Sequence, residues 1–597
     1  MMSAQKVEGT SVDYKPCSGF AISKPLSEMP VVKDGNITIT SKMENNLKQK
    51  LPVQINNKDP QFIIDPIAQL SLGNKTASPP IVNFQASPGN LIPPDPTGAA
   101  GPAHYVQAVN CLYNVYDKTG VSMGGPFYLG AIWSAPSASG GDPIVLYDKY
   151  ADRWFVHQIK GGWYYDSLLI AVSTTSNPLG SYYTYTFVPE PGDLVDYGKF
   201  SVWADGYYSS LHYYSGKKKL AVFDRAKMLA GNPTAGMILM TLPVTPSTWF
   251  FSPLPADADG QLPPYGTPCP FFYFEDDTWS AGGVDQLRIY KLTTDWITPS
   301  NSTMVLDQTL ANSPINVNFD SVNYRDIPQP GTTDKLIAWG IVLNYRAQYR
   351  RWTGYNSVVI NHPVIVNATT KQVGIRWYEL RQNTTTNIWN IYQEGTYAPD
   401  LHCRWLGSIA MDDNGSIGLA YSVSSNTIFP SLGYTGRVAS DPLGQMTFSE
   451  TIAISGTSSQ IFSNPEFGDY SQTTLDPTDG ITFWHTGEYH SGGGQRTRVF
   501  SWQIPNFAGI KEIDSKPELL VFQNENNLNI KGIKLPGNQE TAVDIFDVMG
   551  KLISGKKVNP VAGSFETSLD VGSFAKGTYL VRVGNEKFQK VIKVSLN

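Results

Sequence analysis

One local pattern recurs along the middle of the chain: an apolar strand, a tight turn that contains Asp and often Gly, and then an aromatic-rich strand. It is clearest in residues 144–158, 200–213, 408–422 and 471–486. Asp and Gly adopt the backbone conformations that hairpin turns need, and helical periodicity is nearly absent from residues 104–505. The pattern therefore predicts a long series of β-hairpins.

Weaker copies of the pattern lie around residues 117–120, 275–282 and 351–355. Hairpins that recur every few tens of residues, as these do, are typical of propellers. The four-stranded blades of a propeller take ~40–50 residues each. We therefore predict a seven-bladed β-propeller in which each hairpin forms the inner two strands of a blade. Third strands are expected at residues 168–173, 219–223, 374–380 and 497–502. Six or eight blades, or a pair of β-sandwiches, are the alternatives.

Two flanking segments differ from this series. Residues 1–85 are polar and weakly patterned, and they predict an irregular N-terminal arm before the propeller of residues 86–510. Residues 516–597 are richer in charge and hold at least five short strands, which predict a small Ig-like β-sandwich. The fold class is thus all-β, and residues 224–230 are the one short helix expected in the middle of the chain.

The amino-acid sequence of the last segment contains stretches that resemble a known family. VDIFDVMGKL (543–552), LDVGSFAKGTYLVRV (569–583) and QKVIKV (589–594) closely resemble the C-terminal sorting domain of the type IX secretion system of Bacteroidota. The resemblance implies that the secretion machinery is a partner and that the cargo is secreted or displayed at the cell surface. The turn Asp148–Trp154 makes the middle segment similar to secreted sialidase-like and kelch-like propellers, which implies an architecture but no reaction.

Composition excludes several classes of protein. With 45 Lys+Arg against 51 Asp+Glu, the chain lacks the basic surface of a nucleic-acid binder. Only 16% of residues are charged and 12% are aromatic, which favours an extracellular β-rich protein. The apolar runs are too short for a transmembrane segment, the first residues lack the pattern of a secretory signal, and we expect a monomer.

The candidate site follows from propeller geometry. Loops that enter the inner strands, among them those at Asp95 and Asp142, should open on one face with the loops between second and third strands. The expected catalytic residues are His402, Arg404, Tyr434, Arg437, Asp469, Glu488 and His490 of blades six and seven. The expected substrate-binding residues are Asp142, Trp163, Tyr164, Asp196, Lys199, Tyr397 and Arg496. Carboxylates, Arg forks and aromatic faces on one surface suit a sugar.

We therefore expect a carbohydrate-active enzyme that degrades an extracellular, acidic polysaccharide, and a non-catalytic adhesin or glycan-binding propeller is the alternative. Hydrolysis needs two carboxyl groups, for which the candidate pairs are Asp469 with Glu488 and Asp142 with Asp196. Elimination needs a base and a cation. The candidates for these roles are His402 or His490 with Tyr397 or Tyr434, and Arg404 or Arg437. An ion pair between blades is the structural alternative for Arg404.

No cofactor is required by either reaction. The four cysteines are far apart and never form a CxxC pair, so no zinc site is expected and any disulfide pairing stays open. The turn at residues 412–415 superficially resembles a calcium loop, but Val423 stands where the twelfth-position Glu is required. A structural calcium ion in another loop or in the channel is compatible with the sequence.

Overall fold

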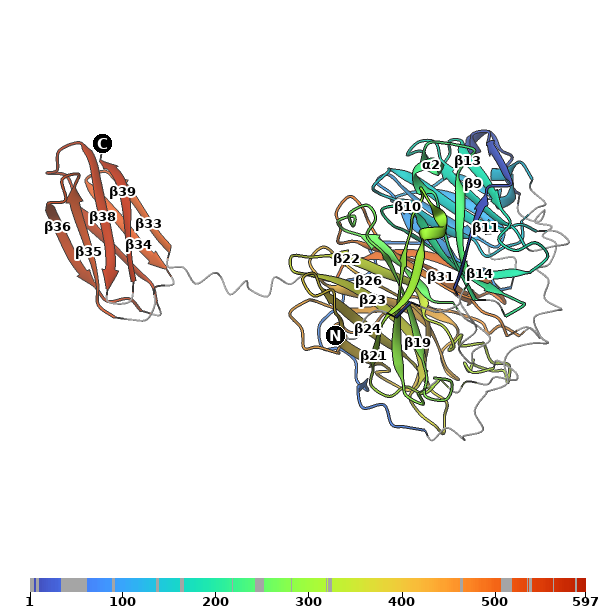
Figure 1. Ribbon diagram of the computed structural model, residues 1–597. Helices are drawn as coiled ribbons and strands as arrows, with labels where there is room; N and C mark the ends of the chain where they lie inside the picture. Colours follow the sequence, from blue (N-terminus) through green and yellow to red (C-terminus); the bar gives the residue numbers. More distant parts are fainter. Residues whose placement is uncertain are drawn as a thin grey trace. The chain divides into compact units, whose positions relative to one another are not determined.

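The computed structural model divides into two compact units, Met1–Pro505 and Asn506–Asn597 (Figure 1). It describes residues 5–6, 10–33, 62–87, 92–135, 139–161, 166–216, 218–241, 252–280, 282–317, 319, 325–461, 465–505, 518–533, 535, 539–561, 563–585 and 588–596. Trp163 and Tyr164 lie outside these residues. No helix in the described ranges is long and apolar enough to cross a membrane.

The first unit is an all-β, propeller-like arrangement of antiparallel meanders, in which each strand pairs with the next along the chain. The first three meanders are β6 (Thr97–Ala100), β7 (His104–Val109), β8 (Leu112–Asp117) and β9 (Ser122–Tyr128); β10 (Ile144–Asp148), β11 (Arg153–Ile159), β12 (Leu168–Ser173) and β13 (Tyr182–Phe187); and β14 (Val195–Val202), β15 (Tyr207–Tyr213), β16 (Lys218–Phe223) and β17 (Gly236–Thr241). The α-helix α2 (Arg225–Leu229) follows β16, and Asp224 caps it by accepting from the backbone N–H of Lys227.

The remaining meanders continue the series. They are β18 (Leu254–Asp259), β19 (Cys269–Glu275), β20 (Gln286–Thr293) and β21 (Thr303–Ala311); β22 (Asn344–Arg351), β23 (Tyr355–Ile365), β24 (Val373–Asn383) and β25 (Trp389–Tyr397); β26 (Cys403–Met411), β27 (Ile417–Ser424), β28 (Ser431–Arg437) and β29 (Thr451–Ile454); and β30 (Gln472–Leu475), β31 (Phe483–Ser491) and β32 (Gly494–Trp502). Parallel pairing of β18 with β22 joins two of them into one ten-stranded sheet.

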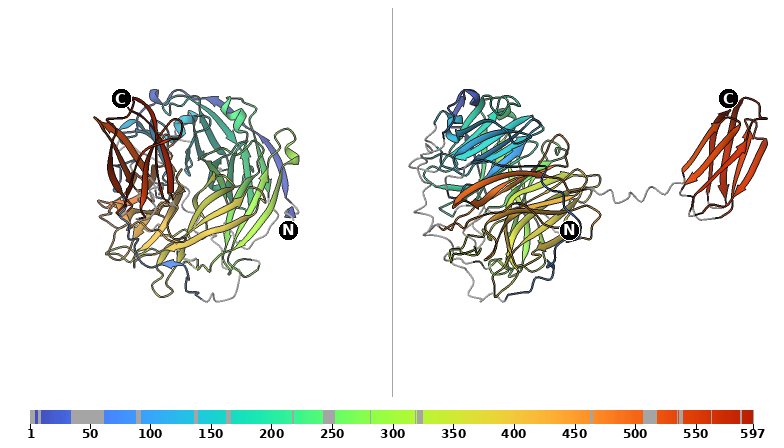
Figure 2. Two further views of the ribbon diagram at one scale, coloured as in Figure 1. Left: turned by 90° about the vertical axis from the view of Figure 1, so that its left-hand side faces the viewer. Right: turned by 180° about the vertical axis from the view of Figure 1, so that it is seen from behind.

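The first strands of the meanders close a ring. Each contacts the next in the order β6, β10, β14, β18, β22, β26 and β30, and β30 returns to β6. The colours follow the same circuit in Figure 2, left, from blue through green and yellow to orange. Polar side chains join the ends of the series: Thr97 Oγ1 donates to Gln472 Oε1, and Gln472 Nε2 donates to the carbonyl of Val145 at 3.0 Å. The ring is therefore closed by side-chain hydrogen bonds from distant parts of the chain.

Most of the predicted hairpins are present. The turns near residues 150, 205, 353, 414 and 480 each connect the first and second strands of a meander, and all four expected third strands are found as β12, β16, β24 and β32. The turns at residues 117–120 and 275–282 were assigned wrongly, because they follow β8 and β19 instead of a first strand. The first hairpin turns instead at Gly101-Pro102-Ala103, where no Asp signals it.

The N-terminal arm differs from the irregular segment that the sequence predicts. It adds short strands to the outer edges of successive meanders: β1 (Gln5–Lys6) pairs with β21, β2 (Ser11–Pro16) with β17, and β3 (Gly19–Ile22) with β13. Farther along, β4 (Ala68–Gln69) pairs with β25 and β5 (Val82–Gln85) with β32. Such short strands carry too little periodicity to be seen in the sequence. We call residues 5–6, 10–33 and 62–87 the outer belt.

Deleting residues 1–24 should destabilise the first unit, because it exposes the edges of β13, β17 and β21, and unpaired edges also promote association between chains. We expect a decrease in melting temperature of about 5 °C or more and a mass above that of a monomer. Calorimetry and light scattering measure both effects. Deleting residues 1–9, which removes β1 alone, is the control with a small expected effect. An unchanged melting temperature and a monomeric mass for the longer deletion would contradict this role of the belt.

The second unit consists of two sheets. One contains β33 (Glu518–Asn524), β34 (Asn527–Ile533) and β37 (Phe565–Asp570), and the other contains β36 (Leu552–Val558), β35 (Thr541–Asp547), β38 (Gly577–Asn585) and β39 (Phe588–Leu596). Apolar residues of both sheets, among them Leu528, Ile530, Val543 and Val581, share one buried cluster. Burial of these alternate side chains drives the sheets together.

Candidate functional site

The first strands of several meanders begin with an unusual backbone conformation. Asp95, Asp142 and Asp469 lie two or three residues before β6, β10 and β30, and their φ angles are 49°, 53° and 60°. Tyr197 and Leu406 have φ angles of 51° and 48° and lie at the bulges of β14 and β26. Non-glycine residues rarely adopt positive φ, and such strain concentrates at functional sites. This end of the ring, where the first strands begin, is called the entry end.

Charged and aromatic side chains from four first-strand regions meet at the entry end. They form the entry cluster, which consists of Asp95, Asp142, Asp196, Tyr197, Lys199, Asp469 and Tyr470. Lys199 is at the centre, on β14, and has no exposed surface. Its Nζ lies 3.3 Å from the centroid of the Tyr197 ring and 4.0 Å from that of Tyr470. No hydrogen bond to Nζ is found among the described residues.

The electrostatic environment of Lys199 has two opposing parts. Burial lowers the pKa of Lys199 to about 8, and the nearby carboxylates of Asp142, Asp95, Asp469 and Asp196 act in the opposite direction. A lysine with such a pKa exchanges protons near neutral pH more readily than an exposed one, and it can donate hydrogen bonds to a bound ligand.

Tyrosines hold the cluster together. The backbone N–H of Tyr197 donates to Asp142 Oδ2 at 2.8 Å, and the hydroxyl of Tyr470 donates to the carbonyl of Pro143 at 2.8 Å. The half-buried ring of Trp339 lies 5.9 Å from that of Tyr197 and comes from the long segment between β21 and β22. The cluster therefore has an aromatic side as well as an acidic one.

Glu488 lies next to the entry cluster on β31. Its carboxyl group accepts a hydrogen bond from the backbone N–H of Gly468, which directly precedes Asp469. Burial raises the pKa of Glu488 well above its usual value. Burial thus favours the protonated form of Glu488, which is the form that a general acid needs. Farther along β31, burial and then Arg496 lower the pKa of His490 to about 4.

Arg404 is fully engaged within the protein. It has no exposed surface, and its guanidinium donates to Glu450 at 2.7 and 3.0 Å and to Asp400 at 2.8 and 2.8 Å. The hydroxyl of Tyr421 donates to Glu450 at 2.7 Å, and the buried ring of Tyr397 lies 5.5 Å from the guanidinium. This network binds the segments before β26 and β29 together, so it supports the structural interpretation of Arg404 within one meander.

Arg437 and Tyr434 lie away from the entry end. Arg437 pairs with Ile417 beside the turn at the far end of β27, whereas Arg404 pairs with Val423. Arg437 donates to the carbonyls of Asp441 and Pro442 at 2.7 and 3.0 Å. Tyr434 is buried, with its ring centroid 4.8 Å from that of Trp502. The predicted set is therefore divided, because Arg437 lies at the last residue of β28 and Tyr434 lies in its middle, away from the entry end.

Some of the other predicted residues lie in the entry cluster or beside it, and others lie elsewhere. Asp142, Asp196, Lys199 and Asp469 belong to the entry cluster, and Glu488 adjoins it. His402 is half-buried and its backbone N–H donates to Asp400, while Arg496, on β32 opposite Tyr489, donates to the carbonyl of Gln495. Sequence analysis did not assign the cluster residues Tyr197 and Tyr470 or the neighbouring Trp339. Gly-Asp pairs before first strands, as at residues 141–142 and 468–469, are the signal that could have placed the site here.

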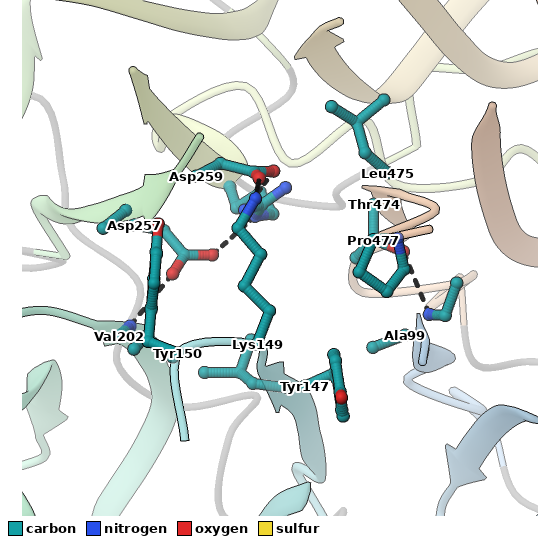
Figure 3. Close-up of a pocket in the computed structure, with 14 residues that line it drawn as sticks. Ala99, Tyr147, Lys149, Tyr150, Val202, Asp257, Asp259, Thr474, Leu475 and Pro477 are labelled. Carbon is teal, nitrogen blue, oxygen red and sulfur yellow. Dashed lines mark hydrogen bonds and ion pairs between the residues drawn. The ribbon is translucent and has the colours of Figure 1, made fainter. Parts of the chain in front are cut away.

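The opposite end of the ring contains a small pocket of about 40 Å³ (Figure 3). Lys149 pairs with Asp259, and Arg346 pairs with Asp257 through Nε at 2.6 Å. Burial favours the neutral form of Asp259, but Lys149, Arg350 and Arg346 together hold its pKa below the usual value. Because these charges neutralise one another, this pocket is a weaker candidate than the entry cluster.

Three acids form the other noteworthy group in the described part of the chain. One carboxylate oxygen each of Asp276, Asp277 and Asp285 lies within 4.8 Å of the others. Burial raises the pKa of Asp276 to about 7. Calcium binds to oxygen ligands of this kind, although such a group also occurs without an ion.

Comparison with known proteins identifies the second unit. Residues 524–597 match the family model described as the secretion system C-terminal sorting domain. The C-terminal unit carries this sorting domain. It directs the protein to the cell surface or the extracellular space, which confirms the predictions from residues 543–552, 569–583 and 589–594.

The sorting domain contains none of the entry-cluster residues, so the site belongs to the exported cargo. No curated protein matches the chain. Solved structures similar to it include an ulvan lyase of polysaccharide lyase family PL25 (10% identity, 75% of this chain and 99% of that chain, TM-score 0.36). Others are a Penicillium chrysogenum α-L-arabinanase complexed with arabinobiose (10%, 52% and 94%, 0.27) and a Trypanosoma rangeli sialidase with the inhibitor DANA (8%, 76% and 83%, 0.28). These likenesses concern the fold alone.

Proposed function

We propose that the chain is a secreted seven-bladed β-propeller enzyme that cleaves a polysaccharide at the entry cluster, with an Ig-like sandwich as its sorting domain. The observation that carries the proposal is the buried Lys199, whose Nζ lies against two tyrosine rings and is acted on by four carboxylates. Glu488, whose pKa is raised by burial, accepts a hydrogen bond from Gly468 directly before Asp469. Carboxyl groups in two protonation states beside aromatic surfaces are what glycoside cleavage requires.

Hydrolysis fits this arrangement better than elimination. Glu488 holds the proton that a leaving glycosidic oxygen needs, and Asp469 supplies a carboxylate for the nucleophile or the base. Lys199 donates hydrogen bonds that can orient sugar hydroxyls, and the half-buried Trp339 offers a ring on which a sugar can stack. In contrast, the arginines expected to stabilise an eliminating uronate are engaged elsewhere, Arg404 with two acids and Arg437 with backbone carbonyls.

Incubating the full chain with a panel of neutral, acidic and amino-sugar polysaccharides tests this function. We expect new reducing ends from at least one polymer, without the ultraviolet absorbance of an unsaturated product. Absorbance that rises with the reducing ends would show elimination instead. Binding without cleavage of any polymer would contradict an enzyme and support the glycan-binding alternative.

A further inference from the structure

The net charge of the entry cluster limits the charge of the sugar that can bind there. Resting on the proposed function, we propose that the sugar bound at the entry cluster is uncharged or cationic, and that the polymer cleaved is not a uronic or sulfated one. This reverses the acidic substrate expected from the sequence. The inference follows from which charges gather around Lys199 and which are neutralised elsewhere.

Acidic groups outnumber basic ones in the cluster. Asp95, Asp142, Asp196 and Asp469 all act electrostatically on the single ammonium of Lys199. His157, the other basic side chain that Asp142 and Lys199 face, is fully buried and its pKa is lowered to about 3 by burial, so it adds no positive charge. The cluster therefore has a formal excess of three negative charges.

Among the residues that the structure describes, the arginines predicted for the site are paired within the protein or lie away from the cluster. Arg404 is buried against Asp400 and Glu450, and Arg437 is at the far end of β28. Arg496 lies beside His490 on the β31–β32 hairpin. A carboxylate or sulfate brought to the cluster would thus meet like charges in a site where burial limits screening by water and salt.

Hydroxyl and ammonium groups suit the same surroundings. Sugar hydroxyls donate to carboxylate oxygens, and the ammonium of an amino sugar forms the stronger charge-assisted bonds. The buried Nζ of Lys199, which has no hydrogen-bond partner among the described residues, supplies donors for hydroxyl or ring oxygens. The half-buried ring of Trp339, 5.9 Å from that of Tyr197, adds apolar surface for the sugar ring.

Matched polymers that differ only in charge test the inference. We would compare polygalacturonate with its methyl ester, and partly deacetylated chitin with fully acetylated chitin fragments, at low salt. Binding is measured by affinity electrophoresis and cleavage by reducing ends. We expect the methyl ester to bind at least tenfold more tightly than polygalacturonate, and the deacetylated polymer to bind at least as tightly as the acetylated one.

Variants assign the effect to the cluster. Asp196→Asn and Asp142→Asn should each reduce the preference for the uncharged ester severalfold, because each removes one negative charge. Asp117→Asn, which makes the same change in an exposed turn between β8 and β9, should leave the preference unchanged. Asp196 is half-buried, so its variant tests the charge effect even if Asp142→Asn fails to fold.

The outcomes separate this inference from the proposed function. Tighter binding or faster cleavage of the acidic member would overturn the inference while cleavage itself upheld the function. Preferential binding of the uncharged or cationic members without cleavage would uphold the inference and overturn the enzyme. Failure of every polymer to bind would overturn both.

Discussion

Replacing Arg404 with alanine should lower the free energy of unfolding of the first unit by about 3–5 kcal/mol, because it leaves the largely buried carboxylate of Glu450 and the half-buried carboxylate of Asp400 without their cation. The guanidinium makes four hydrogen bonds to Asp400 and Glu450 and has no exposed surface. The sequence predicted a catalytic role for this residue, whereas its contacts predict a structural one. Denaturant unfolding followed by tryptophan fluorescence measures the loss.

Two variants serve as controls for Arg404→Ala. Arg496→Ala removes the same type of side chain from the β31–β32 hairpin, where its guanidinium donates to a neighbouring carbonyl, and should change stability by less than about 0.5 kcal/mol. Adding Glu450→Gln to Arg404→Ala should recover part of the loss, because it removes one uncompensated charge. A loss below about 1 kcal/mol for Arg404→Ala would show that the network contributes little.

Replacing Glu488 with glutamine should lower kcat by about 10²–10⁴-fold, since an amide cannot deliver the proton that the leaving oxygen needs. The melting temperature should change little. Glu488 is buried with a raised pKa, so the neutral amide resembles its protonated native form and can still accept from the backbone N–H of Gly468. Activity on a polymer that the wild-type protein cleaves in the panel measures the first effect, and calorimetry measures the second.

The pH profile adds a second readout. A general acid must be protonated, so the wild-type rate should fall as pH rises through the raised pKa of Glu488. Asp205→Asn is the matched control: Asp205 is also buried with a raised pKa, but it follows β14 at the opposite end and accepts from Tyr208 at 2.9 Å. Its activity should stay at the wild-type level. Normal turnover by Glu488→Gln would exclude Glu488 as the acid.

Local features of the fold could be predicted from the sequence. Asp or Gly residues in the turns near residues 150, 205, 414 and 480 mark hairpins, because turn conformation depends on the residues in the turn itself. The same signal misassigned residues 117–120 and 275–282, since an Asp turn shows that a hairpin is present but not which strands of a sheet it joins. The sorting domain was recognisable because its strands are close in sequence.

Long-range contacts were decided only by the tertiary structure. Ring closure brings Asp95, Asp142, Lys199 and Asp469 around one point, although they come from four separate meanders. Arg404 is paired with Glu450, which is 46 residues away, and the outer belt joins edges hundreds of residues from its own strands. Residue spacing identifies the turns and strands, but the partners of a buried charge depend on how whole sheets pack. The structure therefore moved the candidate site from the arginines of β26 and β28 to the entry cluster.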